Sequence, residues 1–396
     1  MHETRFTVKG FKAAAVAAGL KKNGGLDLAL IFSEQDAAAA GVFTTNKVKA
    51  APVILSKEFL QNGTARAIIA NSGNANACTG ISGLDNARKT AGITAEALGV
   101  WSDEVLTAST GVIGEPLKTD LIANALPGLV DNLAEEGLYQ AARAIMTTDS
   151  FPKIAISDGL ADGRPYRILG IAKGAGMIMP NMATMLCFII SDIKIEPRNL
   201  KSALLASVET TFNRITVDGD TSTNDMALVL ANGMAGNRYL SSMEYNDFVS
   251  GLKHVMGDLS RMIVRDGEGA TKLIDIVIRG AHSPSDALVA ARTVANSSLV
   301  KTAFYGQDPN WGRIVAALGR SGIVMEENKL DIWIDDIQIV AMGLGKGTGP
   351  EKDASGRMSQ KEFSLTVDLN QGKYEDRMVT CDLTHEYVTI NANYRT

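Results

Sequence analysis

The 396-residue sequence is poor in proline and cysteine. Its 10 prolines are about half the usual share of ~5%, which excludes Pro-rich linkers. The cysteines are an odd number and lie far apart, so they form no disulfide framework and favour reduced thiols in a cytoplasmic protein. They are Cys78, Cys187 and Cys381.

The sequence also lacks a basic block, a signal peptide and a membrane-spanning run. Lys and Arg number 39 against 44 Asp and Glu, a balance that disfavours binding to nucleic acid or anionic membranes. The longest apolar stretch, Gly174–Ile190, is interrupted at Pro180 and is shorter than the ~20 residues that span a bilayer. The first residues, Met1–Arg5, lack the charged-then-apolar pattern of a leader. We therefore expect a cytoplasmic protein without nucleic-acid or membrane partners.

Common metal and catalytic motifs are missing as well. The four histidines include no pair at metal-ligand spacing. The acidic stretch Asp218–Asp225 resembles a calcium loop, but Thr223 and Val229 stand where an EF-hand needs Gly and Glu. A capped turn is the better interpretation there. The sequence has no Gly-x-Ser-x-Gly motif, and Gly343–Gly347 fits no nucleotide-binding spacing, so we predict no metal and no bound nucleotide.

Strand-like and helix-like segments alternate along the chain. Short buried strands are predicted at Leu28–Ser33, Ala65–Ala70 and Val105–Ser109. The apolar spacing of Leu84–Leu98 predicts a helix that stops at Gly99, and a second helix is expected to start after Ser283.

The last third of the chain has the period-two alternation of strands with one buried face, which is typical of antiparallel sheets with helices on the other side. The alternating segments are Ile274–Ile278, Leu330–Ile334 and Phe363–Leu369. Between the last two, Gly343–Gly349 reads as a flexible surface loop. The whole pattern predicts an α+β fold of layered sheets flanked by helices. We place the main layered domain at residues 1–280 and a smaller strand-rich α/β domain at residues 281–396.

The segment Lys173–Leu186 departs from ordinary structural patterns. It opens with a lysine and two glycines, turns at Pro180 and enters a strand-like run through Thr184. One interpretation is a hairpin turn that leads into a buried strand. The other is that the glycines let backbone approach an anionic group beside the lysine. Cys187, inside the apolar run, is expected to be a buried and inert thiol.

The pair Ala183-Thr184 offers a chemical interpretation. A small residue before a hydroxyl residue suits an N-to-O acyl shift, in which the threonine oxygen attacks the preceding carbonyl. Hydrolysis of the ester then leaves Thr184 as a new N-terminus. Its α-amine, with an ordinary pKa near ~7.7–8.0, can serve as the base for its own hydroxyl.

At this point the sequence resembles the ornithine acetyltransferase family, the bifunctional glutamate N-acetyltransferases of arginine biosynthesis. Eight segments in the expected order carry the resemblance over nearly the whole chain. They are Asn71–Ala77, Ser109–Gly114, Thr147–Ser150, Lys173–Leu186, Thr216–Asp225, Asp266–Lys272, Asp308–Arg313 and Asn391–Thr396. The resemblance implies an αββα-like fold. It also implies that the chain cuts itself between Ala183 and Thr184.

By this resemblance the fragments 1–183 and 184–396 stay associated, as a heterotetramer with two copies of each. Thr184 is the nucleophile, which carries the acetyl group as an ester. Thr110 and Gly111 form the oxyanion hole, with one hydroxyl and one backbone N–H. Without the family, Ser109–Gly111 reads as a turn that ends a strand.

The resemblance also assigns the substrate-binding residues, which are Thr148, Lys173, Thr184, Glu268, Asn391 and Thr396. Lys173 can supply the cation that an amino-acid carboxylate needs, and Glu268 can face the side-chain ammonium of ornithine. Taken without the family, Glu268 reads as a solvated loop carboxylate and the C-terminal tail as frayed.

The implied reaction moves acetyl from N-acetylornithine to glutamate by ping-pong kinetics, without a cofactor. Some members of the family also accept acetyl-CoA as donor, so the resemblance leaves both donors open. One alternative is an aminopeptidase or amidase with the same self-cleaved threonine, which differs only in the access of water to the acyl-enzyme. The other is an uncut protein that only binds amino acids.

Overall fold

The computed structural model describes residues 6–179 and 185–393, which form two compact units. The first unit holds the described residues up to Asn213, together with Asp220–Ile263. The second holds Arg214–Gly219 and the described residues from Val264 onward. The domain limit predicted from the sequence, between residues 280 and 281, falls within strand β9 (Leu273–Ala281) of the second unit.

A single sheet runs through the first unit. Among the described residues its strand order is β4-β3-β2-β8-β7-β6-β5, with β1 beside β2. Its strands are β1 (Phe11–Val16), β2 (Leu28–Phe43), β3 (Thr64–Asn74), β4 (Val105–Val112), β5 (Lys153–Ala161), β6 (Arg164–Lys173), β7 (Leu186–Ser191) and β8 (Met226–Ala231). The strands predicted at Leu28, Ala65 and Val105 are confirmed as β2, β3 and β4.

The long strand β2 belongs to two layers. Its first half pairs with β3, while its second half, Ala38–Phe43, pairs with β8, and the register with β3 shifts between Phe32 and Ala37. Buried side chains of β3 and β4 pack in one cluster with those of β7 and β8. The sheet is thus folded into two stacked layers with a core between them.

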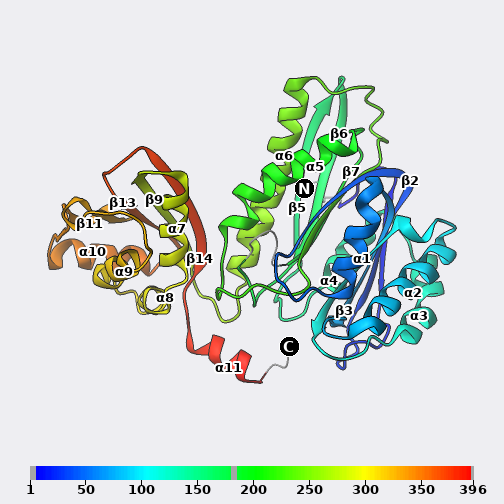
Figure 1. Cartoon of the computed structure of the whole chain (residues 1–396), viewed down its shortest axis with the longest axis horizontal. Helices are drawn as coiled ribbons and strands as arrows, with labels where there is room; N and C mark the ends of the chain where they lie inside the picture. The colour runs from blue at the N-terminus through cyan, green and yellow to red at the C-terminus, as the bar shows by residue number, and fades with distance from the viewer. Residues whose placement is uncertain (1–5, 180–184, 394–396) are drawn as a thin grey trace, which may run out of the picture. The chain divides into compact units, whose positions relative to one another are not determined.

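Helices cover the outer face of each layer (Figure 1). On the β3–β4 layer, side chains of α1, α2 and α3 pack on Leu30 and Ile69. On the other layer, α5 packs on β2, and α6 approaches Gly170 of β6. The helices are α1 (Ala51–Phe59), α2 (Gly80–Leu98), α3 (Thr119–Asp131), α4 (Leu138–Ala144), α5 (Pro197–Thr210) and α6 (Ser242–Arg265). The expected αββα layering is confirmed.

The second unit is built on a sheet whose order, among its described residues, is β12-β11-β10-β13-β9-β14. Its further strands are β10 (Asp331–Ile334), β11 (Ile337–Ala341), β12 (Leu344–Gly345), β13 (Glu362–Asp368) and β14 (Tyr374–Cys381). Its helices are α7 (Pro284–Ala295), α8 (Ser298–Tyr305), α9 (Trp311–Gly319), α10 (Thr348–Met358) and α11 (His385–Asn393). The alternating isoleucines of β9 are buried against α7, as predicted.

Two local predictions for this sheet need correction. Strands β9 and β13 run parallel, because the long connection through α7–α10 carries the chain back to the starting end of the sheet. The segment predicted as the loop Gly343–Gly349 contains strand β12 and the start of α10. Met342 and Gly343 both have positive φ, and this tight turn brings Leu344 back beside Ala341.

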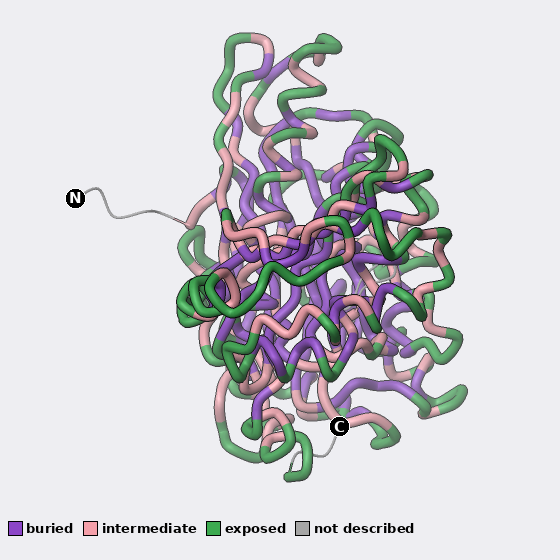
Figure 2. Tube along the Cα trace, turned by 90° about the vertical axis from the view of Figure 1, so that its left-hand side faces the viewer, coloured by how far each residue is buried: buried purple, intermediate pink, exposed green. Residues whose placement is uncertain are grey.

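Helix boundaries follow the local signals in the sequence. Helix α2 ends at Gly99, which adopts the left-handed conformation with φ of 69°. Helix α7 starts after Ser283, whose hydroxyl accepts a hydrogen bond from the N–H of Asp286. The buried stretches in Figure 2 run along the strands, and the exposed ones along loops and outer helix faces.

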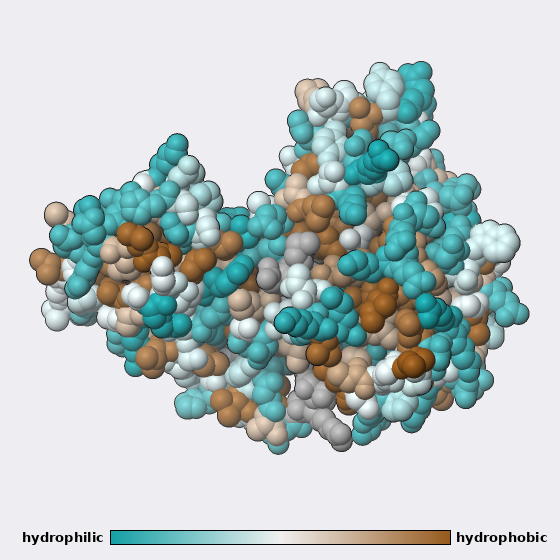
Figure 3. Space-filling view, in the orientation of Figure 1, coloured by the Kyte–Doolittle hydropathy of each residue, from teal (hydrophilic) through white to brown (hydrophobic). Residues whose placement is uncertain are grey.

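Residues 6–179 and 185–393 contain no helix that is long and apolar enough to cross a membrane. On the face shown in Figure 3, hydrophilic side chains surround small groups of hydrophobic ones.

Candidate active site

Thr110 and Gly111 lie at the end of β4, where it runs parallel to β3. Gly111 has φ of 131°, and a Cβ there would lie 2.4 Å from the carbonyl carbon of Gly73 and 2.5 Å from the nitrogen of Asn74. Only glycine therefore lets the two strands approach this closely. Thr110 next to it is only 9% exposed.

A buried network of amide side chains holds this strand end in place. The Asn224 Nδ2 atom donates to the carbonyls of Ser109 at 2.8 Å and Ala75 at 2.6 Å. The hydroxyl of Ser109 donates to Asn71 Oδ1 at 2.6 Å. Three segments that are far apart in the sequence thus meet beside Thr110. Such satisfied buried networks make a backbone position rigid.

Lys173, the last residue of β6, joins the second layer to this strand end. Its Nζ donates a 3.3 Å hydrogen bond to Thr110 Oγ1. Because the oxygen accepts this bond, the hydroxyl hydrogen of Thr110 is directed elsewhere and can donate to another oxygen. A cation and a hydroxyl thus meet at the end of β4, a pair that suits a developing oxyanion.

Asp149 positions the neighbours of this group. Its Oδ1 accepts from Lys153 Nζ at 2.7 Å and from the N–H of Gly174 at 2.6 Å, and its Oδ2 accepts from the N–H of Thr147 at 2.9 Å. Burial alone would raise the pKa of Asp149, but the positive charges of Lys173 and Lys153 outweigh it and lower the pKa to about 2. The half-buried Thr148 lies within the turn that this carboxylate closes.

The row of residues at this end of the sheet crosses three strands. Lys173 of β6 pairs with Leu186 of β7, and Leu186 pairs with Met226 of β8. Strand β7 thus lies in a sheet with β6, a strand from the first 183 residues. The predicted nucleophile Thr184, its neighbour Ala183 and the tail residue Thr396 lie outside the described residues.

Cys187, the second residue of β7, is buried as predicted. Burial raises the pKa of its thiol, so the sulfur is protonated near neutral pH and is a poor nucleophile.

A second buried carboxyl, Asp225, directly precedes β8. It is 3% exposed, and within the described part of the chain its Oδ2 atom has no hydrogen-bond partner. Burial raises the pKa of Asp225 well above its usual value, against the opposing effects of Ser222 and Lys173. The sequence analysis gave no role to Asp149 or Asp225. Their only signal was a place inside the polar segments Thr147–Ser150 and Thr216–Asp225.

Glu268 and Asn391 lie together in the second unit. Asn391 Nδ2 on α11 donates to Glu268 Oε2 at 2.8 Å. Gly269, with φ of 68°, permits the close packing, because a Cβ there would lie 2.6 Å from the nitrogen of Tyr387. Thr384 also donates to the Gly269 carbonyl at 2.7 Å. The structure brings these two predicted residues together, and Thr110 with Lys173 in the first unit.

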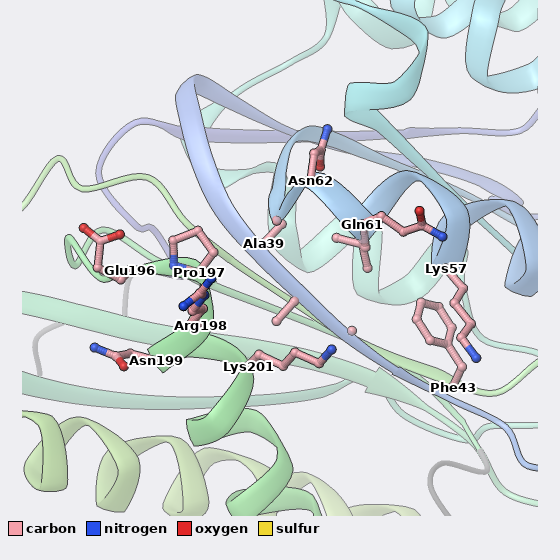
Figure 4. Close-up of a pocket in the computed structure, with 14 residues that line it drawn as sticks. Ala39, Phe43, Lys57, Gln61, Asn62, Glu196, Pro197, Arg198, Asn199 and Lys201 are labelled. Carbon is pink, nitrogen blue, oxygen red and sulfur yellow. The ribbon is translucent and has the colours of Figure 1, made fainter.

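A groove of about 950 Å³ lies elsewhere on the first unit, between the end of α1 and the start of α5 (Figure 4). The second half of β2 forms its floor, and Lys57, Arg198 and Lys201 contribute its positive charges. No residue of the site predicted from the sequence lines this groove. The converging polar groups, rather than the large groove, therefore mark the candidate active site.

Known proteins resemble this chain over nearly its whole length. The model of the ArgJ family matches residues 12–396. The chain belongs to the ArgJ family.

Similar proteins cover nearly the full length of the chain. It is 51% identical over 391 residues to the arginine biosynthesis bifunctional protein ArgJ of Geobacter sulfurreducens, covering 98% of this chain and 100% of that protein. It is 46% identical over 400 residues to the glutamate N-acetyltransferase of Methanocaldococcus jannaschii, covering 98% and 97%. The crystal structure of ArgJ from Bacillus halodurans matches with a TM-score of 0.50 and 41% identity, covering 52% of this chain and 98% of that one.

These similarities confirm two predictions made from the sequence. The family resemblance is correct, and the protein is an acyltransferase of arginine biosynthesis.

Proposed function

We propose that this ArgJ-family enzyme transfers acetyl from N-acetylornithine to glutamate in two steps. In the first step Thr184 Oγ attacks the acetyl carbonyl, ornithine leaves, and Thr184 carries the acetyl group as an ester. In the second step the amine of glutamate attacks the ester, which gives N-acetylglutamate and frees the hydroxyl. The two half-reactions predict ping-pong kinetics. They need no metal and no cofactor, and acetyl-CoA is a candidate second donor.

The observation that carries the proposal is the contact between Lys173 and Thr110 at the ends of β6 and β4. Both steps pass through a tetrahedral oxyanion, which the Thr110 hydroxyl and the Gly111 N–H would stabilise. Lys173 adds the positive charge that an amino-acid carboxylate or an oxyanion requires. Leu186, which pairs with Lys173, begins the strand that follows Thr184 in the chain.

The proposal includes self-cleavage between Ala183 and Thr184. The fragment 184–396 would hold 213 of 396 residues, about 54% of the chain. The solved Bacillus halodurans chain corresponds to 52% of this one, which is compatible with a chain of that length. After the cut, the pairings of β6 with β7 and of β2 with β8 would hold the fragments together. We propose a heterotetramer with two copies of each fragment.

The proposed substrate-binding residues are those that the family resemblance assigns. Thr148 and Lys173 would bind the backbone groups of the amino acid. Glu268, fixed by Asn391, would bind the side-chain ammonium of ornithine. Thr184 and Thr396 complete the proposed substrate-binding set.

Mass spectrometry of the purified protein tests the whole proposal. We expect two fragments with a new threonine N-terminus, and one added acetyl group on fragment 184–396 after incubation with N-acetylornithine alone. Addition of glutamate should remove this group and yield N-acetylglutamate. The Thr184→Ala variant should stay uncut and inactive, and acetyl transfer by that uncut chain would contradict the proposal.

The hydrolase alternative is distinguished by the rate of deacetylation. An aminopeptidase or amidase would lose the acetyl group to water equally fast with and without glutamate. We expect loss of the acetyl group to be much faster with glutamate present.

A further inference from the structure

Self-cleavage needs a base that the later reaction does not use. After the cut, the free α-amine of Thr184 can take the proton of its own hydroxyl. In the uncut chain that nitrogen belongs to a peptide bond, and its lone pair is delocalised into the carbonyl. It cannot act as a base for the first attack, so another group has to accept the proton.

The structure brackets the cleaved stretch with one short segment, Thr221–Met226. On the N-terminal side of the cleavage site, Met179 is anchored because its carbonyl accepts a 3.1 Å hydrogen bond from the Thr221 hydroxyl. On the C-terminal side, Met185 is anchored because its carbonyl accepts a 2.9 Å hydrogen bond from the N–H of Met226. Both flanks of residues 180–184 are therefore held by the segment that carries Asp225.

Asp225 is the titratable residue of this segment. It is 3% exposed, and within residues 6–179 and 185–393 its Oδ2 atom accepts no hydrogen bond. Buried carboxyl oxygens are normally paired, since an unpaired one costs free energy. The carboxyl is also hydrogen-bonded to Ser222. This bond and the positive charge of Lys173 on β6 partly oppose the rise of its pKa.

The other buried carboxyl of the site is unsuitable as a base. Asp149 already accepts hydrogen bonds from Lys153, Gly174 and Thr147. Its pKa is lowered to about 2, so it holds a proton poorly near neutral pH. Burial instead raises the pKa of Asp225, which makes it the better proton acceptor.

We propose that Asp225 is the general base of self-cleavage, which rests on the proposed function of Thr184. Asp225 Oδ2 takes the proton of the Thr184 hydroxyl as Oγ bonds to the carbonyl carbon of Ala183. The bond from that carbon to the Thr184 nitrogen then breaks, and the same proton passes to the departing nitrogen. Water finally hydrolyses the ester, which frees the carboxylate of Ala183 and the hydroxyl of Thr184.

The test compares cleavage of the full chain in the wild type and in Asp225→Asn, which keeps the shape of the side chain but accepts no proton. Gel electrophoresis and intact mass report the cut. We expect cleavage to slow by ~10²-fold or more in the variant. The matched control is Asp192→Asn, because Asp192 is a buried carboxyl with a raised pKa at the opposite end of β7. This control should be cut like the wild type.

Failure of this inference differs from failure of the proposed function. An uncut wild-type chain would overturn both. A wild type and an Asp225→Asn variant that are cut equally fast would overturn only the role of Asp225.

A purely structural role of Asp225 is tested in an uncut background. We expect Thr184→Ala/Asp225→Asn to unfold at the same temperature as Thr184→Ala, or higher, at pH 7–8. The reason is that a buried carboxyl with a raised pKa destabilises the fold increasingly as the pH rises above the pKa that the carboxyl has in the unfolded chain. If the double variant unfolds at a much lower temperature, the Asp225→Glu variant distinguishes a base from a structural residue. Its cleavage rate should rise with pH as the carboxyl ionises, and a rate independent of pH would overturn the role of a base.

Discussion

Lys173 and Thr110 belong to different layers of the first unit, and the ammonium of Lys173 donates a 3.3 Å hydrogen bond to the Thr110 hydroxyl oxygen. This bond orients the hydroxyl so that its hydrogen can serve an oxyanion. It also links the residue expected to bind carboxylate to the one expected to stabilise the transition state.

Replacing Thr110 by valine, which has the same shape without the hydroxyl, should slow acetyl transfer by ~10²–10³-fold with little change in KM. The hydroxyl acts on the charge that develops only in the transition state, so binding of the ground state should persist. Single-turnover rates measure the effect. Thr110→Ser should restore most of the rate, and a Thr110→Val enzyme with normal kcat would contradict the assignment.

Gly111→Ala should destabilise the protein and abolish activity. The new Cβ would overlap the backbone of Gly73 and Asn74, and φ of 131° strains any other residue. We expect a loss of roughly 1–3 kcal/mol in the free energy of unfolding, measured in urea. Gly92→Ala in α2 is the control, because a Cβ there meets nothing within 4 Å, and it should stabilise the helix by about 0.5–1 kcal/mol.

Asp149 should make the stability of the protein depend on pH in the acidic range. Its folded pKa of about 2 lies below the ordinary value of 3.8, so its stabilisation is present above pH ~4 and is lost as pH falls toward 2. The shift corresponds to roughly 2 kcal/mol. Urea unfolding between pH 2 and 5 measures this slope.

The Asp149→Asn/Lys153→Met variant removes both buried charges and should flatten the acid dependence. The single Asp149→Asn change should lower the stability more than the double change at neutral pH, because it leaves the buried Lys153 ammonium without the Asp149 carboxylate. An unchanged acid slope in the double variant would refute the assignment.

Asn224→Asp should weaken both the fold and the site. The substitution keeps the shape but removes the Nδ2 donor to the Ser109 and Ala75 carbonyls, at a cost of about 1–3 kcal/mol for each acceptor left unpaired. The strand end that carries Thr110 should lose its fixed position, so kcat should fall as well. Thermal unfolding and kcat are the measurements. Asn132→Asp on the exposed end of α3 should change neither, and equal effects of the two changes would argue against the network.

Much of the local structure could be predicted from the sequence because its causes are local. Gly99 and Ser283 mark helix ends through their own backbone preferences and hydrogen bonds. The alternating isoleucines of β9 specify which face is buried. The parallel pairing of β9 with β13 was not predicted, because it depends on the path of the helices between them.

The sequence by itself determined the family, the layered fold and the choice of Thr110, Gly111 and Lys173 as candidate site residues, since ordered motifs along the chain carry this information. Only the tertiary structure decided which distant groups meet. Strand β2 changes partners halfway, which stacks β4 against β6 and brings Thr110 within reach of Lys173. Burial and neighbouring charges then give Asp149 and Asp225 opposite pKa shifts. No local pattern could distinguish these two aspartates, because desolvation and Coulomb interactions depend on what the fold places around each carboxyl.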